Sequence, residues 1–153
     1  MIKAEITEKG VSMDYITHSP EETEALGTAY AASLHPGDVV AFSGDLGAGK
    51  TAFTRGVLRG LGYPGRVTSP TFAIANEYDT PRGRVAHFDL YRILDCEALF
   101  EIGFEEYLDG SRIVLIEWSE NAAGILPAHY KTVHIAYGDA PDDRTITTGE
   151  VGA

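Results

Sequence analysis

Short apolar runs and periodic stretches follow one another along this chain of 153 residues and predict alternating strands and helices. Residues 38–42 are a short apolar run typical of a buried strand. Residues 51–61 repeat apolar side chains every three or four positions, which predicts a helix. Residues 113–117 hold four consecutive apolar residues before Glu117. A run without alternation predicts a central strand that is covered on both faces.

The remaining elements follow from the same patterns. Further strands are expected at 12–17, 71–78, 84–91, 131–137 and 144–148, and short helices at 95–100 and 104–108. A helix should begin at the capping signal Ser19-Pro20 and end near Leu34. The turn at 80–83 joins its flanking strands into an antiparallel hairpin. We therefore predict one α/β domain over residues 1–153 with a mixed parallel and antiparallel sheet, and a frayed tail at 149–153.

The loop between the first buried strand and its helix carries the clearest motif. Residues 44–51, Gly-Asp-Leu-Gly-Ala-Gly-Lys-Thr, fit the Gly-x-x-x-x-Gly-Lys-Ser/Thr pattern of a phosphate-binding loop. Its glycines let backbone N–H groups point at phosphate oxygens, its lysine adds positive charge, and its threonine offers a hydroxyl to magnesium. An accidental Gly-rich turn would match the same short pattern, but the order strand, loop, helix favours a nucleotide site. The expected nucleotide-binding residues are Gly44, Asp45, Leu46, Gly47, Ala48, Gly49, Lys50, Thr51 and Ala52.

Two acids on predicted strands are candidates for metal binding or for activating water. Glu117 ends the strand at 113–117, and its carboxylate would face Thr51 and the metal if that strand lies beside 39–42. A solvated strand end is the alternative. Asp89 shares one face of its strand with His87, so we expect His87 to orient Asp89. Asp89 is then expected to bind metal through water or to position the attacking water, unless it simply faces solvent.

Other candidates carry a weaker signal. Thr68, Ser69 and Thr71 form a hydroxyl-rich loop that either senses the γ-phosphate or is an ordinary proline turn. Arg144 could reach the nucleotide. Trp118 is the single tryptophan and follows Glu117; a large aromatic residue is more often part of a core or an interface than of a catalytic group.

Charge and composition narrow the classes of partner. The formal net charge of −11 disfavours unaided binding to DNA or RNA, because a negative surface repels phosphate backbones. Residues 50–92 carry seven of the twelve basic residues against three acids, so either a phosphate site or a docking face for RNA or an acidic partner lies there. No apolar stretch has the length of a membrane span, the amino terminus lacks the apolar core of a secretory leader, and Cys96 has no internal disulfide partner. We expect a cytoplasmic protein.

Four segments, in this order and spacing, resemble the TsaE family, formerly called YjeE: residues 44–51, 69–72 (Ser-Pro-Thr-Phe), 87–92 (His-Phe-Asp-Leu-Tyr-Arg) and Glu117-Trp118. The resemblance implies a three-layer P-loop NTPase-like fold, ATP and Mg²⁺ as cofactors, and ATP hydrolysis that is weak alone and stimulated by partners. It implies action with TsaD and TsaB, and with TsaC upstream, in placing threonylcarbamoyl on the adenosine beside the anticodon of tRNAs that read ANN codons. Hydrolysis would reset the complex, and tRNA would be met through the partners.

The resemblance also implies roles for single residues. Lys50 would hold phosphates and support catalysis together with Asp89 and Glu117. Thr51 and Glu117 would hold magnesium, for which Asp89 is the further candidate named above. Part of the adenine pocket would lie at Ser19 and Pro20, and Arg144 would contact the nucleotide. From its place in the hydroxyl-rich loop, we also expect Ser69 to contact the nucleotide.

Other nucleotide-binding classes compete with this interpretation. A GTPase would need an Asn-Lys-x-Asp motif, and an ABC-type ATPase would need a Ser-Gly-Gly signature; the sequence has neither. A small-molecule kinase would need an arginine-bearing lid, for which residues 95–109 are too acidic. A nucleotide-gated binding module that hydrolyses little ATP is the second alternative.

Overall fold

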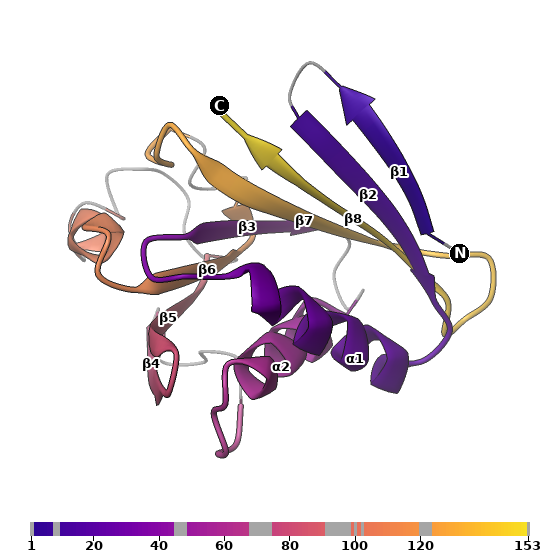
Figure 1. Ribbon diagram of the computed structural model, residues 1–153, viewed down its shortest axis with the longest axis horizontal. Helices are drawn as coiled ribbons and strands as arrows, with labels where there is room; N and C mark the ends of the chain where they lie inside the picture. Colours follow the sequence, from indigo (N-terminus) through magenta and orange to yellow (C-terminus); the bar gives the residue numbers. More distant parts are fainter. Residues whose placement is uncertain are drawn as a thin grey trace.

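The computed structural model describes residues 2–7, 10–44, 49–67, 75–90, 99, 101, 103–119 and 124–152. Within these ranges the chain forms a sheet of eight strands in the order β1-β2-β8-β7-β3-β6-β5-β4 (Figure 1). The strands are β1 (Ile2–Thr7), β2 (Gly10–Thr17), β3 (Val39–Gly44), β4 (Ala75–Thr80), β5 (Gly83–Asp89), β6 (Ile113–Glu117), β7 (Tyr130–Tyr137) and β8 (Arg144–Val151). The helices are α1 (Pro20–Tyr30), α2 (Lys50–Gly60) and the 3₁₀ helices η1 (Ala31–Ser33) and η2 (Phe104–Leu108).

The middle of the sheet is parallel and its flanks are antiparallel. β3 pairs in parallel with β6 on one side and with β7 on the other, and β5 pairs in parallel with β6. β1, β2, β8 and β4 add antiparallel pairings at the two ends. The carboxyl ends of β3, β5, β6 and β7 therefore meet at one edge of the sheet, here called the carboxyl edge. The opposite ends of the same strands form the amino edge. The predicted mixed sheet is confirmed.

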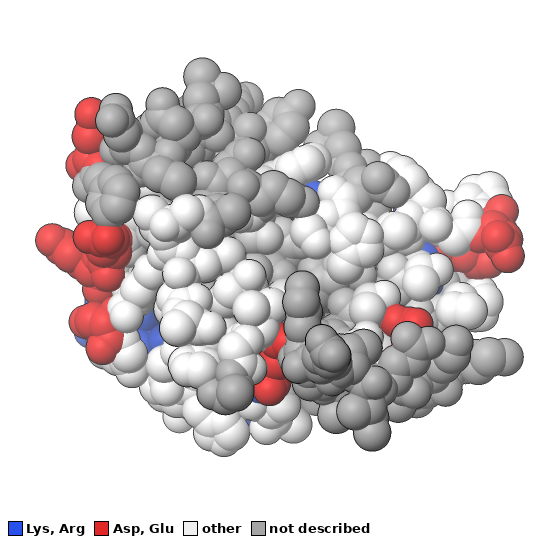
Figure 2. All heavy atoms as spheres, turned by 90° about the horizontal axis from the view of Figure 1, so that it is seen from above, with Lys and Arg blue, Asp and Glu red and all other residues white. Residues whose placement is uncertain are grey.

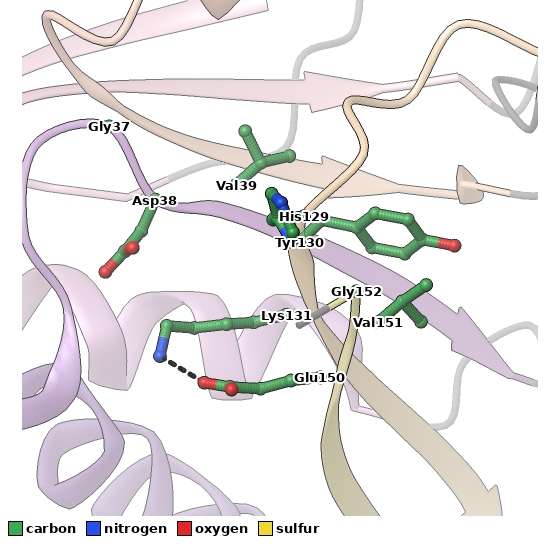
Figure 3. A pocket seen from close by; sticks show the side chains of 9 residues that line it. All are labelled: Gly37, Asp38, Val39, His129, Tyr130, Lys131, Glu150, Val151 and Gly152. Atoms are coloured by element: carbon green, nitrogen blue, oxygen red, sulfur yellow. Dashed lines mark hydrogen bonds and ion pairs between the residues drawn. The ribbon is translucent and has the colours of Figure 1, made fainter. Parts of the chain in front are cut away.

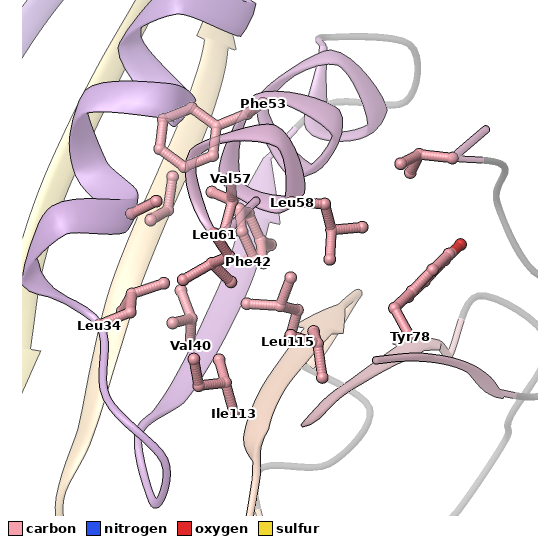
Figure 4. Packing of buried hydrophobic residues seen from close by; sticks show 14 of the residues in the cluster. Leu34, Val40, Phe42, Phe53, Val57, Leu58, Leu61, Tyr78, Ile113 and Leu115 are labelled. Carbon is pink, nitrogen blue, oxygen red and sulfur yellow. The ribbon is translucent and has the colours of Figure 1, made fainter. Parts of the chain in front are cut away.

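One face of the sheet is covered by α1 and α2. Phe53, Val57 and Leu58 of α2 are fully buried against side chains such as Phe42 and Leu115 of the sheet (Figure 4). Burying one such side chain contributes about 1.5–3 kcal/mol, so this layer fixes α2 over β3 and β6. The helical spacing of the apolar residues in 51–61 predicted this face.

A second cluster covers the other face at β5 and β6. Phe88 packs edge-on against Phe104 of η2, with ring centroids 4.9 Å apart. Val114 and Ile116 are buried in the same cluster. All five residues of β6 are thus buried, as their unbroken apolar run predicts, and the three layers are helices, sheet and the η2 segment.

The two long helices cross closely where both carry glycine. A Cβ on Gly27 would lie 2.3 Å from the carbonyl oxygen of Phe53, and one on Gly56 would lie 2.0 Å from that of Glu24. The Thr28 hydroxyl donates across the crossing to the Gly56 carbonyl, at 3.1 Å. This crossing fixes the start of α1 beside the start of α2.

The structure adds detail to the expectations for the termini and the first helix, and it corrects one of them. β1 was not predicted at all. The first helix ends its α-helical part at Tyr30 and finishes as η1. The expected frayed tail is wrong, since residues 149–151 belong to β8, where Gly149 pairs with Thr132 and Val151 with Tyr130. β7 offers backbone partners along its whole length, which keeps the end of β8 in the sheet.

Several predicted segments lie wholly or partly outside the described residues: 71–74 of one strand, 91 of the next, and most of the helix at 95–100. The described parts of that hairpin, β4 and β5, do pair antiparallel around the predicted turn. None of the described helices has the length and apolar character to cross a bilayer.

Candidate active site

Both ends of the phosphate-loop motif lie at the carboxyl edge. Gly44 ends β3 with φ 128° and Gly49 caps α2 with φ 109°, a backbone region that residues with a Cβ rarely enter. A Cβ on Gly44 would also lie 1.9 Å from the Ile135 carbonyl oxygen. The predicted strand and helix on either side of the loop are confirmed. Asp45, Leu46, Gly47 and Ala48 lie outside the described residues.

The first turn of α2 is arranged to bind an anion. Lys50, Thr51 and Ala52 begin the helix, and Gly49 gives its first N–H groups no side-chain cap. Such N–H groups, at the positive end of the helix dipole, are where phosphates bind in other proteins. The structure therefore places these three predicted residues where the motif requires them.

Lys50 is folded into the site. It is 5% exposed, and its Nζ donates to the Gly44 carbonyl oxygen at 3.1 Å. The same Nζ lies 3.5 Å from the centroid of the Trp118 ring. Trp118 follows Glu117 directly, so this contact places the start of α2 beside the end of β6.

Glu117 is buried at the end of β6 and bonded to His87. Its Oε2 lies 2.7 Å from Nε2 of His87, with Glu117 3% exposed and His87 0% exposed. A carboxylate only accepts hydrogen bonds, so Nε2 carries the hydrogen and His87 donates it. Nδ1 of His87 is buried without a hydrogen-bond partner among the described atoms.

The expected role of His87 needs correction. Side-chain parity along β5 does put His87 and Asp89 on one face, but the imidazole is hydrogen-bonded to Glu117 on the neighbouring strand. Parallel pairing sets Asp89 level with Glu117 and His87 level with Leu115, two residues earlier, so the imidazole reaches forward and across to Glu117. The contact depends on strand register, which the sequence does not reveal.

Two acids and one hydroxyl of the predicted magnesium set lie at this edge. Asp89 ends β5 and Glu117 ends β6 in register with it. β6 also pairs with β3, which meets the condition set for Glu117 to face the site. Mg²⁺ takes one or two carboxylates, keeps several waters and prefers oxygen ligands. Asp89, Glu117 and the hydroxyl of Thr51 fit that requirement.

The residues expected around the base lie at the same edge. Ser19 caps α1, its Oγ accepting from the Glu22 N–H at 3.1 Å, and Pro20 is the first helical residue, as predicted. Arg144 begins β8, next to the end of β2. Its Nη1 donates to the carbonyl oxygens of Pro141 and Asp143, each at 2.8 Å. Contacts of these three residues with a nucleotide stay predictions. Ser69 lies outside the described residues.

An ion pair near α1 had no signal in the sequence. Nδ1 of His18 lies 2.8 Å from Oδ1 of Asp143, 125 positions along the chain. This hydrogen bond raises the pKa of His18 above 6.5 and lowers that of Asp143 below its ordinary value. The pair ties the start of α1 to the turn before Arg144.

Much of the positive charge in residues 50–92 is balanced within the fold. Arg55 and Arg59 both pair with Glu24. Arg82 donates to the carbonyls of Ala31 and Leu34 at the end of the first helix, and Arg84 pairs with Asp79. Seen from above, the surface shows several groups of acids and only small areas of Lys or Arg (Figure 2).

A cavity of about 280 Å³ lies at the amino edge, away from the motif (Figure 3). The residues before β3, at the start of β7 and at the end of β8 line it. Lys131 and Glu150 form an ion pair in its wall, with Nζ 2.9 Å from Oε1. None of its lining residues belongs to the predicted site.

Comparison with known proteins agrees with the four-segment resemblance. The family model described as threonylcarbamoyl adenosine biosynthesis protein TsaE matches residues 17–146. The chain belongs to the TsaE family. Members of the TsaE family take part in the biosynthesis of threonylcarbamoyladenosine in tRNA.

Individual relatives support the family and the fold. A Bacillus subtilis TsaE is 42% identical over 137 residues, which are 89% of this chain and 84% of the relative. A Haemophilus influenzae TsaE is 48% identical over 101 residues, 66% of this chain and 64% of that relative. The crystal structure of Bacillus subtilis YdiB superposes with a TM-score of 0.75 at 37% identity and covers 99% of this chain and 88% of that one. The predicted fold class is confirmed.

Proposed function

We propose that this TsaE family member is a Mg²⁺-dependent ATPase. The observation that carries the proposal is the packing of Lys50, first residue of α2, against Trp118, the residue after Glu117. It brings the lysine of a phosphate-loop motif and a strand-end carboxylate to one edge of a parallel sheet. Ligands bind at this edge in open α/β sheets.

Each residue at the edge has a task that follows from its chemistry. Bound Mg²⁺ and ATP supply the transferable phosphoryl group and the counter-charge for it. Lys50 and the first N–H groups of α2 bind phosphate oxygens. Thr51 and Glu117 hold the metal. Because α2 is packed into the core, these groups are fixed before the nucleotide arrives, which lowers the cost of ordering them.

Asp89 and His87 complete the arrangement. Asp89 lies level with Glu117 and positions water, either on the metal or for attack on the γ-phosphate. His87 donates to Glu117 and fixes the direction of its carboxylate. Arg144, Ser19 and Pro20 lie at the same edge of the sheet and would contact the nucleotide.

We propose that hydrolysis serves threonylcarbamoylation of the adenosine beside the anticodon in tRNAs that read ANN codons. The protein acts in the cytoplasm with TsaD and TsaB, and its ATP turnover resets their complex after each round. The net charge of −11 supports contact with tRNA through these partners, since the surface itself repels a phosphate backbone.

The test is ATP hydrolysis with and without TsaD and TsaB. We expect slow phosphate release by the protein alone and a large increase when both partners are added. The matched controls are Glu117→Gln, at the carboxyl edge, and Lys131→Met, at the amino edge. The first should lose stimulated turnover and the second should keep it. Absence of stimulation in the complete mixture would contradict the proposal.

Two other outcomes would point to different functions. Labelled γ-phosphate that appears on a metabolite rather than as inorganic phosphate would indicate a small-molecule kinase. Full tRNA modification by a Glu117→Ala or Asp89→Ala protein that still binds ATP would indicate a nucleotide-gated binding module.

A further inference from the structure

The contact between Lys50 and Trp118 is an unusual use of a tryptophan next to a strand-end acid. The Lys50 ammonium lies 3.5 Å from the ring centroid, at cation–π distance, while it donates to the Gly44 carbonyl oxygen at 3.1 Å. Trp118 itself is only partly buried and packs on the cluster formed by β5, β6 and η2. Its ring therefore connects the cluster on the η2 face of the sheet to the start of α2.

The backbone at Trp118 is held in a strained form. Its φ is 59°, and it is the only residue other than glycine with positive φ in the part of the chain that the structure describes. The chain is fixed on both sides of it. The Leu90 N–H donates to the Glu117 carbonyl oxygen at 3.1 Å, and the Ser119 hydroxyl donates to that of Phe42 at 3.0 Å. Strain of this kind persists where neighbouring contacts over-determine it, and it is common at functional sites.

This turn determines which way the indole points. In β6, Leu115 packs on the α2 face and Ile116 on the η2 face. Strand alternation then puts Glu117 on the α2 face. A continued strand would send residue 118 wholly to the η2 face. The left-handed backbone instead ends the strand and leaves the ring against Lys50 at the carboxyl edge.

A lysine side chain has four rotatable bonds and loses much rotamer freedom when it is fixed. If the nucleotide had to fix Lys50, that loss would weaken binding. The ring face and the Gly44 carbonyl already hold the ammonium in the absence of a nucleotide.

We propose that Trp118 is a positioning residue that holds the Lys50 ammonium by a cation–π contact, ready for the phosphates of the nucleotide. This inference rests on the proposed ATP site and adds to it how its lysine is oriented. The ring acts through Lys50 and not on the substrate. Its effect is therefore confined to ligands that carry phosphate.

Because Trp118 is the only tryptophan in the chain, fluorotryptophan incorporated during expression changes this ring alone. Fluorine withdraws electron density from the ring face and weakens its attraction for a cation, with little change in shape. We expect the Kd for ATP with Mg²⁺ to rise stepwise with one and then two fluorines, by about three- to tenfold in total. The Kd for adenosine, which has no phosphate, should not change.

Two results would overturn the inference. An unchanged Kd for ATP across the series would mean that the ring only packs, and a falling Kd would mean that it holds the lysine away from the phosphates.

A second readout needs no nucleotide: Lys50→Met should shift the indole NMR signal of Trp118, whereas Arg59→Met on the same helix should not. No shift with Lys50→Met would also overturn it. Failure of the unlabelled protein to bind ATP would instead overturn the proposed function.

Discussion

The charged side chains at the two ends of the parallel strands differ in how far they are buried. At the carboxyl edge Lys50, His87 and Glu117 are all at least 95% buried. At the amino edge the Lys131–Glu150 pair is more open to water, with the Lys131 and Glu150 side chains 20% and 61% exposed. Burying an ionised group costs several kcal/mol, whereas an exposed ion pair contributes about 0–1 kcal/mol. Within the described part of the chain, the buried charged residues Lys50 and Glu117 both lie at the carboxyl edge, where ligands bind in open α/β sheets.

The fold explains how both edges arise from the same strands. The apolar run of β6 continues to the residue before Glu117, and that of β3 continues to Phe42, so the core extends nearly to the carboxyl edge. There α2 begins, and Lys50 in its first turn lies against Trp118, the residue after Glu117. The amino edge has loops and the end of β8 in place of a helix start. The cavity in Figure 3 lies at this amino edge, and its charged residues Lys131 and Glu150 pair with each other.

The largest effect should come from Glu117→Gln. An amide oxygen still accepts from Nε2 of His87, so the fold should remain, but the negative charge for the metal is lost. We expect ATP turnover to fall about a hundredfold or more, with an unfolding free energy close to that of wild type. Phosphate release and urea denaturation measure the two quantities. Wild-type turnover would show that Glu117 has no catalytic task.

His87→Leu should have the next largest effect. It removes the donor that orients Glu117 and leaves a buried carboxylate short of one hydrogen bond. ATP turnover should fall about 10- to 100-fold, and the free energy of unfolding should fall by about 1–3 kcal/mol. His87→Gln, whose amide can donate, should recover part of both losses.

A matched control for His87 lies on β7, three strands along the sheet from β5. His134 is exposed and bonds to the Ser43 hydroxyl at 2.8 Å. His134→Leu should leave turnover unchanged. If it were as harmful as His87→Leu, burial and contact with Glu117 would not explain the effect.

Changes at the amino edge should be small. Lys131→Met or Glu150→Gln breaks an exposed ion pair, and the unfolding free energy should change by about 1 kcal/mol or less. ATP turnover should stay at the wild-type value. A loss of turnover with either variant would break the distinction between the two edges.

The smallest effect concerns His18 and Asp143. Since the pKa of His18 is raised in the folded state, its stabilising contribution is complete below the ordinary histidine pKa and is lost as pH rises through the raised value. The lowered pKa of Asp143 gives a contribution that is complete above the ordinary aspartate pKa and is lost as pH falls. The pair therefore stabilises fully between about pH 4 and about pH 6.5.

NMR titration of His18 checks this directly. Asp143→Asn should move the pKa of His18 down toward 6.5, because the charged hydrogen-bond partner is removed. An unchanged pKa would mean that the ion pair does not form in solution.

Local patterns predicted the elements well but not the partners of side chains. The apolar run of β6 and the helical spacing of α2 identified both elements to within a residue or two, because the apolar positions in each segment are the ones that the fold buries. β1 was missed because no pattern was recognised before residue 12. The end of β8 was taken for a tail because its stability comes from β7, a different part of the chain.

The site shows the same division. The motif predicted Lys50 and Thr51 at the start of a helix, and the strand-end position predicted Glu117. The link from His87 to Glu117 depends on how β5 and β6 align, and the link from Lys50 to Trp118 depends on a backbone turn that the residue type disfavours. Neither is encoded in spacing along one segment.

The most direct test of the difference between the two edges is an NMR titration with a non-hydrolysable ATP analogue and Mg²⁺. We predict that the amide signals of the carboxyl edge shift, namely those of Gly49, Lys50, Thr51, Asp89, Glu117 and Trp118. The signals of Asp38, His129, Lys131 and Glu150 at the amino edge should stay in place. Shifts confined to the amino edge, or no shift at the start of α2, would contradict the account.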